Sequence, residues 1–276
     1  MSDLYKLAAF AETEGGGNPA GVWIGDALPD DAEMQRIAAE VGFSETAFIA
    51  PASGARRTVR YFSPEVEVPF CGHATIATGA VLGRRDGAGR YELDTLVGIV
   101  PINVREQDGD FVASLTSVEP RQRSIDDALI NDILATLGWS REQLDDSIPV
   151  MAVFAGAWHI VIALRERETL AALDYGFDAL KQLLQAGDFV TLQLIWRENE
   201  SLYHSRNPFP VGGVVEDPAT GAAAAALAGY LRAARLVDIP TSIVVRQGED
   251  MGRPSVLHVD IPESGGIVVS GSVRDL

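Results

Sequence analysis

The chain has 276 residues, of which 47% are hydrophobic and 22% charged, as expected for a folded globular protein with room for two domains. Its 22 basic and 39 acidic side chains give a formal net charge of −17, which argues against binding to nucleic acid or to an anionic membrane surface. A single cysteine excludes an intramolecular disulfide and favours a cytoplasmic enzyme, and we recognise neither a signal peptide nor a membrane span.

The first half of the chain alternates between strand-like and helix-like segments. Asp30–Gly42 has the apolar spacing of a surface helix and ends in a glycine suited to a C-cap. Short runs rich in β-branched and aromatic residues flank this helix. The strands predicted in this half are Gly21–Gly25, Thr46–Ala50 and Thr58–Phe62.

The glycine-rich stretch Gly15–Gly25 is not predicted to bind a nucleotide. It matches neither GxGxxG nor GxxxxGK[ST], and no acidic residue follows it in the appropriate context. Asn18 and Pro19 are predicted instead to form a rigid turn that leads into the strand.

The second half of the chain repeats this order of elements. Trp158–Leu164 and Phe189–Trp196 are predicted as strands, and Phe177–Gly187 is predicted as the helix between them. A repeated order of this kind suggests that the two halves share one architecture.

An offset of 146 residues relates the two halves. It carries Phe43–Ile49 onto Phe189–Ile195, Arg60 onto Arg206 and Pro64 onto Pro210. After one deletion it also aligns the Ala-Thr pair at 74–75 with the pair at 219–220. Charged residues and proline interrupt the pattern near Ser117–Ser124. We therefore predict an N-terminal domain over residues 1–118 and a C-terminal domain over residues 119–265.

A run of small residues follows each Ala-Thr pair. The second run, Gly221–Leu231, is rich in alanine and glycine and nearly free of charge, so it is stable as a helix only when it is buried on all sides. We expect each domain to wrap its strands around one such helix. The N-terminus of each helix has unpaired N–H groups, and if both face the cleft between the domains they form a site for a carboxylate.

Cys71 and His73 stand at the start of the first of these helices. From the residues alone, Cys71 is either a small buried hydrophobe or a nucleophile activated by the helix N-terminus, and His73 is either a structural residue or part of a site. No metal site is predicted, because His159, His204 and His258 have no ligand spacing and the HxxxH, CxxC and HExxH motifs are missing.

Asp217 lies at the corresponding place in the second half. It precedes Pro218, and since proline is favoured in the first turn of a helix, Asp217 is predicted to lie near an N-cap. It is either a structural cap or a group that faces His73 across the cleft. The position equivalent to Cys71 then falls in a region of carboxylates, which excludes an epimerase with two catalytic cysteines.

Glu45 interrupts an otherwise apolar strand. A buried glutamate must be paired or protonated, and such a residue suits a general acid and base, whereas a glutamate on an edge strand would simply face solvent. The equivalent residue of the second half is Thr191, so the repeat provides a single candidate base.

Four motifs together resemble the PhzF-like phenazine-biosynthesis family of the diaminopimelate-epimerase-fold superfamily. The resemblance implies an α/β (α+β) fold of two pseudo-symmetric domains, each a curved, mostly antiparallel sheet wrapped around a central helix. It also implies that the C-terminal segment, residues 266–276, returns to the first domain, and that the protein is a homodimeric isomerase without a cofactor. The matching motifs are Gly17–Val22, Ser44–Ile49, Arg60–Thr75 and Glu216–Gly221.

The resemblance also implies roles for individual residues. Glu45 occupies the position of the proton shuttle, and His73 and Asp217 occupy positions that help to hold the substrate. Ala222 stands where the family often has serine, and the second half reads RNPFP where the family commonly reads RxFxP. The further substrate-binding candidates are Asn18, Gly72, Gly221 and Ala222, with Cys71 and Thr220 as additional candidates.

The sequence thus predicts a cofactor-independent isomerase that moves a proton on a small carboxylate-bearing metabolite. Glu45 is expected to act as its general acid and base in the interdomain cleft, with no metal and with neither nucleic acid nor membrane as a partner. The alternative is a non-catalytic small-molecule-binding or regulatory protein on the same fold. A third possibility is hydrolase or transferase chemistry that depends on Cys71.

Overall fold

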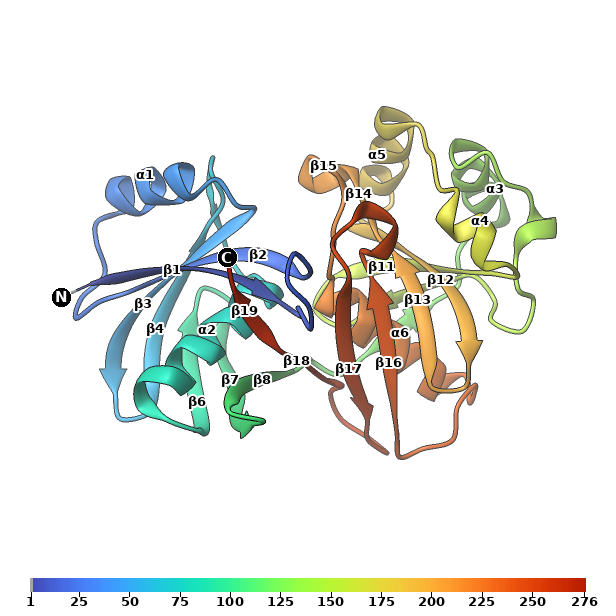
Figure 1. Cartoon of the computed structure of the whole chain (residues 1–276). Helices are drawn as coiled ribbons and strands as arrows, with labels where there is room; N and C mark the ends of the chain where they lie inside the picture. Colours follow the sequence, from blue (N-terminus) through green and yellow to red (C-terminus); the bar gives the residue numbers. More distant parts are fainter. Residues whose placement is uncertain (1) are drawn as a thin grey trace. The chain divides into compact units, whose positions relative to one another are not determined.

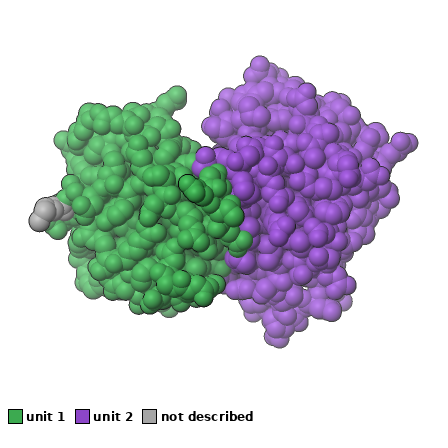
Figure 2. All heavy atoms as spheres, viewed as in Figure 1, with its two compact units in different colours: residues 1–116, 270–276 green, residues 117–269 purple. Residues whose placement is uncertain are grey.

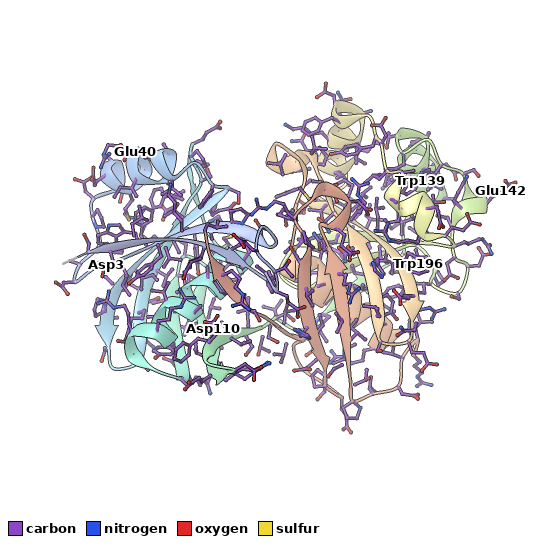
Figure 3. All side chains as sticks on the ribbon, viewed as in Figure 1. Asp3, Glu40, Asp110, Trp139, Glu142 and Trp196 are labelled. Atoms are coloured by element: carbon purple, nitrogen blue, oxygen red, sulfur yellow. The ribbon has the colours of Figure 1, made fainter. Side chains whose placement is uncertain are left out.

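The computed structural model describes residues 2–276, which form two compact units (Figure 2). Among the described residues, unit 1 comprises residues 2–116 and 270–276, and unit 2 comprises residues 117–269. Within the described residues, no helix combines the length and the apolar character that crossing a membrane requires. Acidic side chains that include Asp3, Glu40 and Glu142 are exposed on the surface (Figure 3).

Unit 1 is a sheet closed around one helix, α2 (Gly72–Asp86) (Figure 1). Its strands pair in the order β1–β2–β3–β4–β6–β7–β8, and only β2–β3 and β4–β6 are parallel. The C-terminal strands join the two ends of this sheet, because β18 pairs with β8 and β19 pairs with β1. The strand bounds are β1 Asp3–Ala9, β2 Asn18–Ile24, β3 Glu45–Ser53, β4 Arg56–Phe62, β6 Gly89–Thr95, β7 Gly98–Gln107, β8 Asp110–Thr116, β18 Val268–Gly271 and β19 Val273–Asp275.

Unit 2 is built in the same way around α6 (Gly221–Ala233). Its strands pair in the order β9–β10–β11–β12–β13–β16–β17, and only β11–β12 and β13–β16 are parallel. The strand bounds are β9 Arg121–Arg123, β10 Met151–Phe154, β11 Trp158–Leu164, β12 Thr191–Asn199, β13 Leu202–Arg206, β16 Thr241–Gln247 and β17 Ser255–Ile261.

Surface helices cover the outer faces of both sheets. In unit 1, Met34 and Ala38 of α1 pack against Phe48 and Phe62. In unit 2, leucine and isoleucine side chains of α3, α4 and α5 pack against the outward side chains of β11 and β12. Because strand side chains alternate, the residues between these outward positions face the central helix. The bounds are α1 Asp31–Val41, α3 Asp127–Thr136, α4 Arg167–Ala171 and α5 Phe177–Ala186, with short elements β5 Glu67–Val68, β14 Pro208–Phe209, β15 Val214–Glu216 and three 3₁₀ turns at Arg141–Gln143, Pro210–Gly212 and Glu249–Met251.

The registers of the two sheets confirm the predicted offset of 146 residues. Phe48 of β3 pairs with Arg60 of β4, and Leu194 of β12 pairs with Arg206 of β13. Each position of the first pair is therefore 146 residues before its counterpart. Together with the buried helix in each unit, this confirms the predicted mixed α/β fold of two pseudo-symmetric halves.

The predicted alignment of the two Ala-Thr pairs is wrong. Glu67 pairs with Phe62 in unit 1 and Glu216 pairs with Pro208 in unit 2, so these two glutamates correspond at an offset of 149. The segment between the paired residues has four residues in unit 1 (63–66) and seven in unit 2 (209–215). An insertion in this loop, and not a deletion, precedes the second central helix.

Candidate functional site

Glu45 is the first residue of β3, in the interior of the unit 1 sheet. Strand β3 lies between β2 and β4, and Glu45 pairs with Ala20 of β2. Alternation places its side chain on the face opposite Phe48, which packs under α1, and hence on the side of the central helix. The Glu45 side chain is only 21% exposed. Glu45 is therefore not a surface glutamate on an edge strand.

Cys71, Gly72 and His73 form the start of α2. Cys71 is the N-cap, and its side chain makes no capping hydrogen bond. The first intrahelical bond runs from the Thr75 N–H to the Cys71 carbonyl at 3.0 Å, so the N–H groups at 72–74 have no partner within the helix. These groups give the helix N-terminus a partial positive charge.

The side chains of Glu45, Cys71 and His73 converge at this helix end. Glu45 Oε2 lies 3.4 Å from His73 Nε2 and 3.5 Å from Cys71 Sγ, and Sγ lies 3.3 Å from His73 Nδ1. The Ser44 hydroxyl lies 3.4 Å from His73 Nε2. Cys71 and His73 are both buried. A carboxylate, a thiol and an imidazole thus lie within 4 Å of one another at the start of α2 in unit 1.

Two buried hydroxyl groups hold the backbone of Cys71 in place. The Thr75 hydroxyl donates to the Cys71 carbonyl at 2.7 Å, and the Tyr61 hydroxyl lies 2.7 Å from the Thr75 hydroxyl. Burial raises the pKa of Tyr61 well above its usual range, which keeps this hydroxyl protonated. The start of α2 is therefore fixed by strand β4 as well as by the helix itself.

Gly72 is the open point of the site. A Cβ atom at this position would meet no heavy atom within 4 Å, although the residues on both sides of it are buried. Space next to a helix N-terminus lets an anionic group approach the unpaired N–H groups.

The predicted substrate-binding residues of the second half lie in unit 2, at the start of α6. Thr220, and not Asp217, is the N-cap, and it makes no side-chain capping bond. The Thr220 hydroxyl donates to the Asp217 carboxylate, and the Gln247 amide donates to the Asp217 carbonyl at 2.7 Å. Asp217 thus lies near the N-cap, as predicted, but Pro218 does not lie in the first turn, because the helix begins at Gly221.

Asn18 begins β2 and does not form the predicted turn. Asn18 is buried and pairs with Ala9 of β1, so the strand already includes Asn18 and Pro19. The turn is made by the preceding glycines. Gly17 has a φ of +78°, and a Cβ atom there would lie 2.7 Å from the Ala9 carbonyl oxygen, so only glycine fits.

The repeat shows that the cluster of Glu45, Cys71 and His73 has no equivalent set of side chains at the corresponding positions of unit 2. Thr191 is the counterpart of Glu45, as predicted, because both follow the same register on their strands. At the offset of 149, Thr220 is the counterpart of Cys71, and Ala222 is the counterpart of His73. The counterpart of Cys71 is thus a threonine, which lies three residues after Asp217 and donates a hydrogen bond to its carboxylate, so the second half has no thiol at this position.

Sequence reasoning missed that Cys71 and His73 acquire a carboxylate as a third neighbour. Along residues 2–276, Glu45, Cys71 and His73 form the one group of three side chains whose ligand atoms lie close enough to share a metal ion. The prediction considered spacing along the chain, whereas Glu45 comes from a strand that precedes Cys71 by 26 residues.

Known proteins are similar to this chain along nearly its whole length. A family model described as phenazine biosynthesis-like protein (PhzC-PhzF) matches residues 7–272. The trans-2,3-dihydro-3-hydroxyanthranilate isomerase of Pseudomonas fluorescens is 32% identical over 93% of this chain and 89% of its own length. Other relatives that match along nearly the whole chain are also named isomerases.

Solved structures show the same fold. The PhzF-family phenazine biosynthesis protein of Bacillus anthracis superimposes with a TM-score of 0.88 at 24% identity, covering 100% of this chain and 97% of that one. A probable proline racemase from Agrobacterium radiobacter K84 superimposes with a TM-score of 0.66 at 12% identity, covering 100% and 91%. The fold is therefore shared with this probable proline racemase.

Proposed function

Since the chain belongs to the phenazine biosynthesis-like PhzC-PhzF family and is an isomerase, we propose that it moves a proton between two carbon atoms of a small carboxylate-bearing metabolite, without a cofactor. Glu45 acts as the general acid and base. The observation that carries this proposal is the position of the Glu45 carboxylate, which lies at the N-terminus of a buried helix and within 3.5 Å of Cys71 and His73.

The proton transfer takes two steps. The Glu45 carboxylate removes a proton from a substrate carbon, and the electron pair of the broken C–H bond shifts into the conjugated system of the substrate. The protonated Glu45 then returns its proton to another carbon on the same face. One carboxylate suffices, because both steps occur on one side of the substrate. This agrees with the repeat, in which threonine stands at the counterpart of Glu45.

The start of α2 stabilises the negative charge of the substrate. The N–H groups at 72–74 have no partner within the helix, and His73 lies beside them. Fixed donors at a helix end stabilise a carboxylate or a developing enolate without reorganisation. The opening beside Gly72 gives an anionic group access to these donors.

The unit 2 residues are proposed as further substrate contacts. Asp217 and Thr220 are joined by a hydrogen bond immediately before α6, whose first residues are Gly221 and Ala222. This proposal is supported by the resemblance of the EDPATG motif to the family's motif. Asn18 in unit 1 is proposed as a substrate contact on the same ground. Replacement of Asp217 by Asn is expected to raise KM more than it lowers kcat.

The experiment uses exchange of substrate hydrogen with solvent. The chain is incubated in D₂O with trans-2,3-dihydro-3-hydroxyanthranilate, the compound named for a relative, and with a panel of other unsaturated cyclic carboxylic acids. Glu45→Gln is expected to reduce deuterium incorporation by about 10²–10⁴-fold, the usual contribution of a general acid or base. Binding measured by calorimetry should be largely retained.

A matched control is Glu40→Gln, which replaces an exposed glutamate on α1. This variant should exchange at the wild-type rate. Full exchange by Glu45→Gln would show that another group moves the proton. Absence of both deuterium exchange and isomerised product with every acid would contradict the proposed reaction, because a proton that stays on Glu45 between the two steps is returned without exchange.

A further inference from the structure

We propose that Gln247, the last residue of β16, is a positioning residue of the isomerase. It holds the segment of residues 217–220, which leads into the central helix of unit 2. This inference rests on the proposed function, in which Asp217 and Thr220 contact the substrate. Gln247 acts through this segment and does not itself touch the substrate.

The amide group of Gln247 makes three hydrogen bonds to the segment. Its Nε2 group donates to the Asp217 carbonyl at 2.7 Å and to the Thr220 hydroxyl at 3.1 Å. Its Oε1 atom accepts from the Thr220 N–H at 3.3 Å. The Gln247 side chain is fully buried, which limits it to this arrangement. One amide group on a neighbouring strand therefore fixes both ends of the segment.

These bonds also fix the direction of the hydrogen bond between Thr220 and Asp217. An amide Nε2 group only donates, so the Thr220 oxygen accepts from Gln247 and its own proton goes to the Asp217 carboxylate. The amide has one suitable orientation, because the Asp217 carbonyl requires a donor and the Thr220 N–H requires an acceptor. Gln247 thus keeps the Asp217 carboxylate as the acceptor of the Thr220 proton.

The backbone after β16 also packs closely on the segment. Gly248 has a φ of +76°, and a Cβ atom there would lie 2.8 Å from the Pro218 carbonyl oxygen. On another strand end, the Asn207 carbonyl accepts from the Asp217 N–H at 3.0 Å. The segment is therefore held by its backbone, as a binding group requires if its side chain is to keep one position.

The two units hold the starts of their central helices with different side chains. In unit 1, the hydroxyl groups of Tyr61 and Thr75 hold the Cys71 carbonyl. The offsets of 146 and 149 residues make Asn207 and Ala224 their counterparts in unit 2, and neither of these has a hydroxyl group. The start of α6 therefore needs another support.

Strand β16 provides this support in unit 2. The register of β16 on β13 matches that of β6 on β4, which makes Thr95 the counterpart of Gln247. The Thr95 hydroxyl donates to the Gly98 carbonyl at 2.8 Å, within its own hairpin. The contact of Gln247 with a helix start thus belongs to unit 2, where the hydroxyl pair of unit 1 is replaced.

The kinetic test uses two variants of similar length and trans-2,3-dihydro-3-hydroxyanthranilate, with the panel of acids already named, as substrate. Gln247→Met removes all three hydrogen bonds, and Gln247→Glu keeps the acceptor but lacks the donor when it is ionised. Each is expected to raise KM by about 3- to 10-fold, as loss of a hydrogen bond does, with kcat changed less than about twofold. An unchanged KM in both variants would overturn the proposal.

A double-mutant cycle tests whether Gln247 acts through Asp217. In the Asp217→Ala background the carboxylate to be positioned is missing, so Gln247→Met should change KM by less than about twofold there. Residues that act through one contact give effects that do not add. Equal effects of Gln247→Met on KM in the wild-type and Asp217→Ala backgrounds would overturn the proposal.

The control is Ser255→Ala, which removes a buried hydrogen bond from the same hairpin. Ser255 pairs with Gln247 in the β16–β17 ladder, and its hydroxyl donates to the Arg253 carbonyl at 3.1 Å. This variant is expected to keep the wild-type KM. A rise in KM as large as that of Gln247→Met would show that loss of stability, and not positioning, changes binding.

Hydrogen exchange of the backbone separates this inference from the proposed function. Mass spectrometry of the whole chain should show faster amide exchange over residues 217–224 in Gln247→Met than in wild type or Ser255→Ala, because the Thr220 N–H loses its acceptor. Unchanged amide exchange there would overturn the positioning role. A wild-type chain that converts no acid would contradict the proposed function, and faster amide exchange in Gln247→Met would still support the fixing of the segment.

Discussion

At the scale of a single residue, a substitution at Gly72 is expected to lower activity without lowering stability. It is the first residue of α2, and a methyl group at its Cβ position would extend into open space beside the proposed anion site. We predict that Gly72→Ala folds normally, since alanine is favoured over glycine in helices by about 0.5–1 kcal/mol. We also predict that kcat/KM falls at least about tenfold, or ~1.4 kcal/mol, because the methyl group obstructs the substrate carboxylate. Thermal unfolding and steady-state kinetics measure the two effects.

The control for this variant lies two turns further along the same helix. A Cβ atom at Gly79 would lie 2.5 Å from the Cβ atom of Ala113, so Gly79→Ala should destabilise unit 1 through overpacking. Gly72→Ala with full activity would show that substrate does not approach the helix there.

At the level of elements, the repeat provides two matched ion pairs at the strand that precedes each central helix. Arg60 makes two hydrogen bonds to Glu67 in unit 1, and Arg206 makes the equivalent bonds to Glu216 in unit 2. The pairs differ in burial. The side chains of Arg206 and Glu216 are 12% and 5% exposed, whereas those of Arg60 and Glu67 are both 23% exposed.

This difference predicts unequal costs for the same substitution. Arg206→Met leaves a buried carboxylate without its partner and should lower the free energy of unfolding by about 3–5 kcal/mol. Arg60→Met should cost less, because water reaches Glu67 more easily. Urea unfolding followed by tryptophan fluorescence measures both. Combining Arg206→Met with Glu216→Met should recover stability, and equal losses for the two arginine variants would contradict the argument from burial.

For the whole molecule, a buried histidine predicts sensitivity to acid. His159 of β11 is fully buried, its Nδ1 lies 2.7 Å from the Thr191 hydroxyl, and its Nε2 has no hydrogen-bond partner among residues 2–276. Burial lowers the pKa of His159 to about 3 from the usual 6.5. Between these two values the unfolded chain binds a proton that the folded chain does not bind.

The stability of the protein should therefore fall as the pH is lowered from about 6.5 towards 3. The slope contributed by this one group is at most about 1.4 kcal/mol per pH unit. Replacement of His159 by Gln should remove that contribution, whereas His258→Gln, which replaces an exposed histidine, should retain it. Unfolding midpoints in denaturant, measured at several pH values, test this, and parallel curves for wild type and His159→Gln would contradict it.

The strand registers were predictable because they depend on local hydrophobic pattern. The offset of 146 correctly identified Arg206 as the position equivalent to Arg60. A buried strand cannot shift by one residue without turning its core side chains to the other face of the sheet. The start of the second central helix was not predictable in this way. The loop of residues 209–215 has no periodic hydrophobic pattern. The identity of the Ala-Thr pairs at 74–75 and 219–220 therefore led to the wrong alignment.

The sequence by itself determined the architecture of two related halves and the identity of the acid/base candidate. Alternating apolar residues fix strands, and runs of alanine and glycine without charge require buried helices. Only the tertiary structure decided that Glu45 meets both Cys71 and His73. That meeting depends on the register of β3 in its sheet and on the start of α2 at Cys71, two conditions set by separate strands, turns and buried hydroxyl groups. No spacing along the chain encodes it, because the distance between such side chains is fixed by packing.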